Sequence, residues 1–338
     1  MVTQSELRLL AQTWGVPVSA VWRDYVLGWL LWGIFHHPAL APHLVLKGGN
    51  CLRKVYLPET RLSADLDFTT RQSDIGERLR RHLPGICRRI ATHADIPFDL
   101  PQIRIVDRAT PDADCRATEV RVYFQGLARS IRMRAKFDIS AYEAIALPLQ
   151  YHPLRHPFSD AAACQVTVQT YSLEEVLAEK LRSWIQRTRT RDLYDIVALI
   201  DSAAVPIVEQ NIRTAFWRKT IYKAVPWCGR QEMLYAPKLD HIRAHWSASL
   251  LCPRAAQRPV EPTILRFQRF IERLFAPTPL PAGSGVPPAT FYNAQTGFRE
   301  AIIAAGRARQ LVRVRYGSHE RNVEPYSFRF KQRLYVRI

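Results

Sequence analysis

One stretch, Leu44–Phe68, constrains the fold more than any other part of the chain. Its sequence is LVLKGGNCLRKVYLPETRLSADLDF. The apolar run at its start predicts a short buried strand, and Gly48 and Gly49 predict a turn after that strand. The residues that follow have the apolar spacing of a helix. The stretch therefore predicts a strand, a glycine turn and a helix in immediate succession.

A second strand is predicted at the end of the same stretch. Apolar and polar residues alternate strictly over Arg61–Phe68. Alternate residues of a strand point to the same face, so Asp65 and Asp67 are expected side by side on the polar face. Ser63 precedes them on that face.

This pattern suggests a phosphate-binding turn beside a metal site. Glycines let backbone N–H groups approach a phosphate closely, and paired carboxylates bind Mg²⁺ together with substrate phosphates. Each feature has an ordinary alternative, since Gly-Gly also forms tight turns and D-x-D also occurs on solvated strand faces. Their order along the chain favours the functional interpretation.

A third carboxylate is predicted on another strand. Strand patterns occur at Ile103–Val106, Val120–Phe124 and Ile131–Ile139. The last of these alternates cleanly and places Asp138 on a polar face with arginine and lysine. Asp138 would complete a two-metal site, although decoration of an edge strand also explains it.

Two helices are predicted within residues 172–200. Lys180 falls on the apolar, inward face of the first, so its ammonium needs an anionic partner. The second begins near Thr190 and carries Arg191, Asp192 and Asp195. Earlier in the chain, residues 75–93 form a basic helical segment for which Pro84-Gly85 predicts a break.

Composition indicates a polyanionic partner. The chain has 338 residues and a formal net charge of +18, an excess typical of nucleic-acid-binding proteins, although a solvated basic surface is the alternative. The six cysteines show no C-x-x-C spacing, which predicts reduced thiols. The start MVTQSELRLL and the short apolar runs predict no signal peptide and no membrane span, hence a cytoplasmic protein.

The motifs together resemble a known family. KGGNCLRKVY followed by RLSADLDF is similar to the signature of AbiEii-type nucleotidyltransferase toxins, which belong to the DNA polymerase β-like superfamily. The upstream VWRDYVLGWLL and the downstream LEEVLAEKLRSWIQRTRTRDLYDIVAL also resemble that family. The resemblance spans residues 5–200. Asn50 stands where the family usually has Thr.

The resemblance implies roles for the motif residues. Asp65, Asp67 and Asp138 would hold Mg²⁺ or Mn²⁺. NTP would be the substrate and Lys180 would neutralise its phosphates. The residues expected to contact the nucleotide are Lys47, Gly48, Gly49, Ser63, Lys180, Arg191 and Asp195. Asp195 would orient Lys180 or Arg191, whereas Arg191 and Asp192 could equally form a structural ion pair.

The C-terminal part resembles a second family. Residues 276–290 are rich in proline and glycine and predict a linker. The sequence after Phe298, with RVRY, RNVEPY and LYV, resembles a WYL-type domain, a small SH3-like barrel that binds nucleic acid or ligands. A basic β appendage without separate function is the alternative. The arginines expected to bind nucleic acid are Arg313, Arg315, Arg321, Arg329 and Arg333.

These observations predict an α+β protein with a polymerase β-like core of mixed sheet and helices, a helical domain and a barrel module. The expected parts are N-terminal helices at 1–40, a nucleotidyltransferase core at 41–165, a helical domain at 166–275, the linker at 276–290 and the WYL-like module at 291–338.

The expected function is metal-dependent nucleotide transfer from NTP to RNA, with the tRNA 3′ end favoured. The protein would serve as the toxin of a toxin–antitoxin or phage-defence system and would pair with an antitoxin. One alternative is a WYL-type regulator with a vestigial transferase core. Another is transfer to a protein or small molecule, against which the positive charge argues.

Overall fold

The structure, a computed structural model, describes residues 1–109, 116–128, 131–141, 143–202, 206–223, 225 and 229–276, together with the backbones of four C-terminal strands. These residues form two compact units. The first comprises 1–143, 148–173 and 250–258, and the second comprises 144–147, 174–249 and 259–338. The α+β class is confirmed, because a mixed sheet and helices share the first unit.

Two helices open the chain, as predicted. Helix α1 (Gln4–Trp14) begins where the Thr3 side chain accepts a hydrogen bond from the Glu6 N–H, and it ends at Gly15, whose φ of 67° is left-handed. Helix α2 (Val18–Phe35) follows and is buried over most of its length. Such burial explains why its sequence is apolar on nearly every face.

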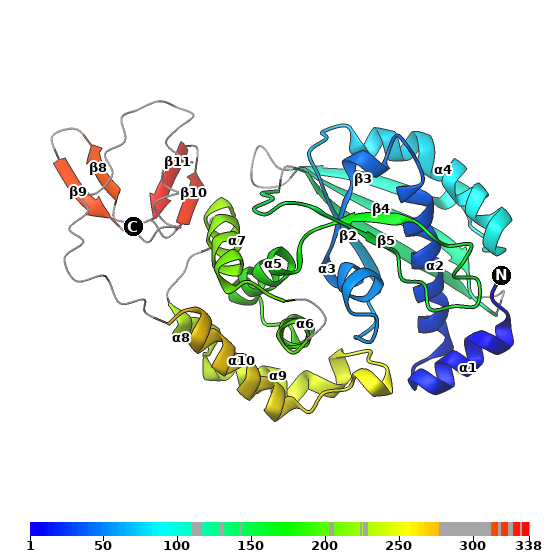
Figure 1. The fold of residues 1–338 in the computed structure, drawn as a ribbon. Coiled ribbons are helices and arrows are strands. Elements are labelled where there is room, and N and C mark those ends of the chain that lie inside the picture. Colours follow the sequence, from blue (N-terminus) through cyan, green and yellow to red (C-terminus); the bar gives the residue numbers. More distant parts are fainter. Residues whose placement is uncertain are drawn as a thin grey trace. The chain divides into compact units, whose positions relative to one another are not determined.

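A seven-stranded mixed sheet forms the centre of the first unit (Figure 1). Its order is β3-β4-β5-β2-β1-β7-β6. The strands are β1 (Val45–Lys47), β2 (Asp65–Thr70), β3 (Arg104–Ala109), β4 (Arg116–Gln125), β5 (Arg132–Ala141), β6 (Gln150–Pro153) and β7 (Thr167–Thr170). Strand β2 lies between β5, to which it is parallel, and β1, to which it is antiparallel. Strand β7 lies beyond residue 165, where the sequence places the end of the core.

The two faces of this sheet differ in chemistry. One face carries buried apolar residues, among them Leu46, Leu66, Phe68 and Phe137. The opposite face carries the charged residues of β2 and β5, as the alternation predicts. Strand pairing therefore determines which charged side chains become neighbours.

Strand β2 begins later than predicted. It starts at Asp65 rather than at Arg61, so the expected alternation does not hold over 61–64. The Leu62 N–H donates to the Leu251 carbonyl at 2.8 Å, and Arg61 is buried with only 6% exposed. The backbone of this segment thus bonds outside the sheet, which is why the strand cannot include it.

The predicted break at Pro84-Gly85 is wrong. Helix α4 runs without interruption from Ile75 to Ala94 with Pro84 inside it. Its apolar stripe packs on α2, where Gly33 makes room for Ile86 and Ile90. Burial of that stripe outweighs the hydrogen bond that the proline removes.

Short segments connect the larger elements of the first unit. They are η1 (Ala41–His43), α3 (Gly48–Cys51), the π-helical turn η2 (Leu52–Tyr56), η3 (Leu100–Gln102) and η4 (Arg254–Ala256). Helix α3 and η2 together form the helix predicted after the glycine turn.

The second unit is largely helical. Its helices are α5 (Leu173–Gln186, whose first residue lies in the first unit), α6 (Thr190–Ile200), α7 (Glu209–Tyr222), α8 (Arg230–Met233), α9 (Ala236–Ser249) and α10 (Val260–Leu274). Trp184 of α5 packs edge-on against Phe267 of α10 in its core. The predicted helices at 172–200 are confirmed.

Four strands lie near the C-terminus. They are β8 (Val312–Tyr316), β9 (His319–Val323), β10 (Ser327–Lys331) and β11 (Arg333–Arg337). They pair as two antiparallel hairpins, β8 with β9 and β10 with β11. The SH3-like barrel expected of a WYL-type module stays a prediction. The predicted linker lies, from residue 277 onward, outside the described residues.

Two general expectations are tested by the described residues. Cys51, Cys87, Cys164 and Cys252 are buried and reduced, as the absence of paired spacing predicts. Within the part of the chain that the structure describes, no helix is long and apolar enough to cross a membrane.

Candidate active site

The first glycine of the turn packs directly on a candidate carboxylate. Gly48 follows β1 and has a φ of +73°, a conformation that favours glycine. A Cβ atom at this position would lie 2.1 Å from Oδ2 of Asp67. Two features that are separate in the sequence, Gly-Gly and D-x-D, are therefore in contact in the fold.

The second glycine makes the same kind of contact with Ser63. A Cβ atom at Gly49 would lie 2.7 Å from the Ser63 Oγ and 3.0 Å from an Arg61 Nη2 atom. The structure thus brings Gly48, Gly49, Ser63 and Asp67 together, as expected of residues that share one site.

Asn50 is a residue whose importance the sequence did not reveal. Its side chain is fully buried, and its Nδ2 donates to the carbonyls of Asp65 (2.7 Å) and Ser63 (3.3 Å). These bonds tie the glycine turn to the start of β2, where the carboxylates begin. The only signal was that Asn stands where the resembling family has Thr.

A row of charged residues crosses four adjacent strands. In the strand register Lys47 of β1 is opposite Asp67 of β2, Asp67 is opposite Asp138 of β5, and Asp138 is opposite Glu119 of β4. Registered neighbours share a face. The prediction that Asp65, Asp67 and Asp138 lie on one polar face is therefore consistent with the pairing.

The ammonium of Lys136 contacts two carboxylates of this row, those of Asp138 and Glu119. The Lys136 Nζ lies 2.7 Å from Asp138 Oδ2 and 3.7 Å from a Glu119 oxygen. Burial opposes charging of Lys136, but Asp138, Glu119 and Asp65 outweigh it and raise the pKa of its ammonium. Lys136 thus keeps its positive charge beside Asp138, Glu119 and Asp65.

The donor set suits a hard divalent cation. Carboxylate oxygens are the ligands that Mg²⁺ prefers, and three of them stand on neighbouring positions of two strands. Among the described residues, no three acidic, histidine or cysteine side chains converge closely enough to form a metal site. The oxygen ligands of these residues fit a divalent metal. In this structure the Asp138 carboxylate instead forms an ion pair with Lys136.

Lys47, predicted to contact nucleotide, is held by another acid. Its Nζ donates to Glu143 Oε2, and both side chains are more than nine-tenths buried. This ion pair anchors the end of β1 immediately before Gly48.

A buried ion cluster supports the turn from behind. Asp24 of α2 accepts from the Arg53 Nε at 2.9 Å and from the Lys54 Nζ at 2.6 Å. Arg53 also donates to the Thr60 carbonyl at 2.8 Å. Burial opposes ionisation of Asp24, but Lys54 and Arg53 outweigh it and hold the pKa of Asp24 below its ordinary value. The cluster thereby fixes η2 against α2.

Lys180 has the anionic partners that its inward position predicts. Its Nζ lies 3.1 Å from Asp192 and 2.8 Å from Asp195, and both carboxylates are essentially fully buried. Asp192 also pairs with Arg187 at 3.1 Å. Asp195 therefore contacts Lys180, one of the two partners proposed for it, and Asp192 pairs with Lys180 and Arg187.

The five C-terminal arginines are placed by backbone only. Arg313 and Arg315 lie in β8, Arg321 in β9, Arg329 in β10 and Arg333 in β11. Their side chains lie outside the described part of the structure, so their role stays a prediction.

A comparison with protein families identifies the family of the chain. The family model described as "Nucleotidyl transferase AbiEii toxin, Type IV TA system" matches residues 29–278, which is 250 of the 338 residues. The chain belongs to the AbiEii toxin family. This AbiEii protein is therefore a nucleotidyltransferase, a toxin of the type IV toxin–antitoxin class whose systems include a cognate antitoxin.

Of the solved structures compared with this AbiEii toxin, the following one supports its fold. MenT4, a nucleotidyltransferase toxin from Mycobacterium tuberculosis H37Rv, aligns with a TM-score of 0.50 and 20% identity over 81% of this chain and 90% of that one. JHP933 from Helicobacter pylori aligns with a TM-score of 0.46 and 15% identity over 76% of this chain and 91% of that one. Among curated proteins, none matches the AbiEii chain in sequence.

Proposed function

We propose that this toxin transfers a nucleotide from NTP to the 3′ hydroxyl of an RNA, with the tRNA 3′ end as the favoured acceptor. One observation carries the proposal: the glycine turn packs on Asp67, and Asp67 is paired in register with Asp138. This supports the proposal that the glycine turn binds phosphate next to the proposed metal ligands.

The carboxylates would hold the metal. Asp65, Asp67 and Asp138 are the proposed ligands of Mg²⁺ or Mn²⁺, supported by their common face and oxygen chemistry. A bound divalent cation neutralises the triphosphate and lowers the pKa of an attacking hydroxyl. Lys136 would release Asp138 or share it when the metal is present.

The turn would orient the nucleotide. Without a Cβ at Gly48 or Gly49, phosphate oxygens would be able to approach the backbone N–H groups closely, and the Ser63 hydroxyl beside Gly49 would be able to donate to them. Lys47 keeps the turn anchored through Glu143 and would reach phosphate only by exchanging that partner.

In the transfer step the RNA hydroxyl oxygen attacks the α-phosphorus. The bond to pyrophosphate breaks and the hydroxyl proton is released. We assign Lys180 to neutralising phosphate charge, with Asp195 orienting it through the 2.8 Å contact. Arg191 is a further proposed nucleotide contact.

The acceptor and partners follow from charge and family. A net charge of +18 favours RNA over a neutral acceptor. The arginines of β8 to β11 would add a second nucleic-acid contact if these strands form a WYL-like module. The antitoxin of this type IV system is the proposed protein partner.

Labelled nucleotide transfer tests the proposal. Wild-type protein with Mg²⁺ and each labelled NTP should label bacterial RNA, and Asp65→Ala should lower the rate at least about a hundredfold, because it removes a proposed metal ligand. Asp240→Ala is the matched control, since its carboxylate is 66% exposed in an ion pair on α9. Equal labelling by wild type and Asp65→Ala would exclude the role of Asp65, and labelled protein without labelled RNA would exclude the acceptor.

A further inference from the structure

The charged face of the sheet continues beyond the carboxylates as a stripe of cations. In register, Arg104 of β3 is opposite Arg121 of β4, and Arg121 is opposite Lys136 of β5. Lys136 is in turn opposite Asp65. Three cations in one row thus lead directly to a candidate metal ligand.

The next rows extend the stripe along β5. Arg134 is opposite Tyr123, and Arg132 is opposite Gln125. The Arg132 guanidinium lies 4.2 Å above the Tyr123 ring. Arg132 and Asp138 are six residues apart on one strand, roughly 20 Å. The stripe is therefore long enough to follow several nucleotides of a strand.

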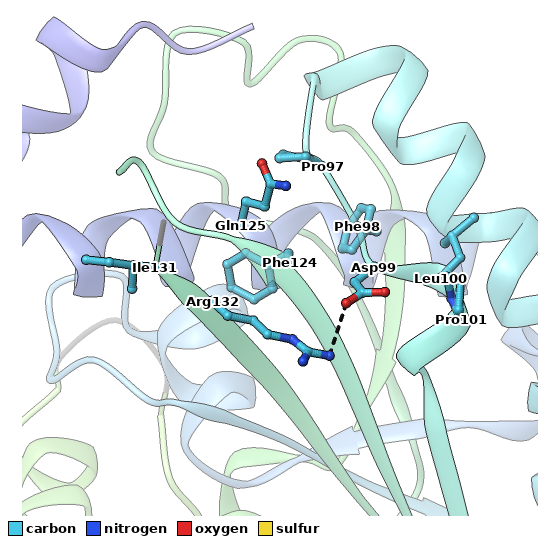
Figure 2. A pocket seen from close by; sticks show the side chains of 9 residues that line it. All are labelled: Pro97, Phe98, Asp99, Leu100, Pro101, Phe124, Gln125, Ile131 and Arg132. Atoms are coloured by element: carbon cyan, nitrogen blue, oxygen red, sulfur yellow. Dashed lines mark ion pairs between the residues drawn. The ribbon is translucent and has the colours of Figure 1, made fainter. Parts of the chain in front are cut away.

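A cavity lies beside the end of the stripe that is farther from the carboxylates, next to Arg132. Arg132 pairs with Asp99 at 3.0 Å at the rim of a cavity of about 540 Å³, which Phe98, Phe124 and Ile131 also line (Figure 2). An apolar hollow beside a stacked guanidinium and a tyrosine is the setting in which unpaired bases bind proteins.

Like charges in register need an explanation. Cations directly opposite each other destabilise a sheet. The carboxylate of Glu119 forms ion pairs with three cations of this face, namely Arg108, Arg121 and Lys136. Arg104 and Arg134 are exposed, and among the described residues no ion pair involves either. The face therefore carries excess positive charge that a polyanion would compensate.

We propose that this face, the residues Arg104, Arg121, Tyr123, Arg132, Arg134 and Lys136, binds the acceptor strand of the RNA and leads its 3′ end to Asp65, Asp67 and Asp138. Phosphates contact the arginines and Lys136, and a base stacks near Tyr123 and Arg132. The inference rests on the proposed function, because it assigns a binding surface to the acceptor of that reaction.

A charge-matched pair of variants tests the surface. Arg104→Gln with Arg134→Gln removes two charges from the stripe, and neither arginine forms an ion pair with another described residue. Arg81→Gln with Arg88→Gln removes two exposed charges from α4. Helix α4 lies on the other face, since Gly76 packs on Asp107, which alternates with Arg104 along β3. Thermal unfolding checks that both variants fold.

Binding is measured with fluorescein-labelled unfractionated bacterial tRNA, without NTP, from about 50 to about 300 mM KCl. The stripe variant should bind about tenfold more weakly near 150 mM, and its slope of log K against log salt should be shallower by about 1.4 to 1.8, as for two lost phosphate contacts. The α4 variant should match wild type. An unchanged slope, an equal loss in the α4 variant, or no binding by wild type would overturn the proposal.

Kinetics separate this inference from the function on which it rests. The stripe variant should raise KM for tRNA and leave KM for NTP and the rate at saturating tRNA unchanged. If wild type transfers nucleotide and the stripe variant has an unchanged KM for tRNA, the surface assignment alone is wrong. If wild type binds tRNA through the stripe but transfers nothing to it, the proposed reaction fails and the surface stands.

Discussion

At the scale of single residues, the glycine turn is shaped by what packs on it. Gly48 has a left-handed φ and touches Asp67, and Gly49 touches Ser63. Asn50 then fixes the carbonyls on either side of Ala64. The turn and the carboxylates therefore depend on each other for their positions. A substitution in the turn should displace the Asp67 carboxylate.

Replacing Gly48 with alanine should damage both stability and activity. The left-handed backbone costs an L-residue about 1–3 kcal/mol, and the new methyl would collide with the Asp67 carboxylate. We expect a lower urea unfolding midpoint and a loss of nucleotide transfer greater than the loss of folded protein explains.

Gly85→Ala is the control for this substitution. Gly85 lies inside helix α4 with open space where its Cβ would be. Alanine there should stabilise the protein by about 0.5–1 kcal/mol and leave transfer unchanged. Full activity in Gly48→Ala would show that the position of Asp67 does not depend on the turn.

At the scale of elements, buried apolar stripes and buried ion clusters determine where helices continue and how they are joined. Helix α4 continues through Pro84 because its apolar residues on both sides of the proline are buried, namely Leu79, Leu83, Ile86 and Ile90. Helices α5 and α6 are joined in a different way, by Lys180 between Asp192 and Asp195.

Pro84→Ala should stabilise the protein. Proline inside a helix removes one backbone hydrogen bond and crowds the preceding turn, while alanine is the best helix former. The expected gain is about 1–3 kcal/mol in the free energy of unfolding, measured by urea titration. A loss of stability would show instead that α4 needs the bend or the packing of the proline ring.

Lys180→Met should destabilise the second unit by about 3–5 kcal/mol, because it removes the cation that the buried carboxylates of Asp192 and Asp195 share. Adding Asp195→Asn to this variant should restore part of the loss, since one of the two like charges is gone. Urea midpoints of the single and double variants measure the coupling. Additive losses would contradict a shared cluster.

The pH dependence of this cluster has a definite sign. Burial opposes ionisation of Asp192, but Lys180 and Arg187 outweigh it and lower its pKa from the ordinary value of 3.8. The stabilisation is then complete above that value and lost as the pH falls through the lower folded-state pKa. In Lys180→Met one of the two cations that lower the pKa of Asp192 is gone, so the free energy of unfolding should depend less on pH over the same range.

At the scale of the whole molecule, excess positive charge is the dominant property. Cations on the charged face of the sheet contribute part of the net charge of +18, while the opposite face supplies the apolar core beneath α2 and α4 (Figure 1). The seven-stranded sheet therefore has one face that packs in the apolar core and one face that carries charged residues.

Salt should weaken transfer to RNA far more than it weakens use of NTP. An interface that neutralises six to ten phosphates loses about three to five orders of magnitude in affinity between about 50 and 200 mM salt. We expect KM for tRNA to rise steeply over this range and KM for NTP to rise little, measured by initial rates. Equal salt sensitivity of the two would favour a protein or small-molecule acceptor.

Much of this architecture was predictable from local pattern. The first two helices, strands β1, β3, β4 and β5, and helices α5 and α6 follow from periodicity and turn signals. The start of β2 and the continuity of α4 were not predictable, because hydrogen bonds and contacts with distant segments decide both. Strands β6 and β7 are only four residues each, too short to show a period.

The candidate site residues and the faces on which they lie could be predicted from local pattern, since alternation places Asp65 with Asp67 and helical spacing turns Lys180 inward. Which of these residues meet depends on the folding of distant segments against one another. Pairing of β2 with β5 sets Asp67 beside Asp138, and a left-handed Gly48 lets the turn touch Asp67. Register and close packing depend on strands far apart in the chain, and no local pattern encodes them.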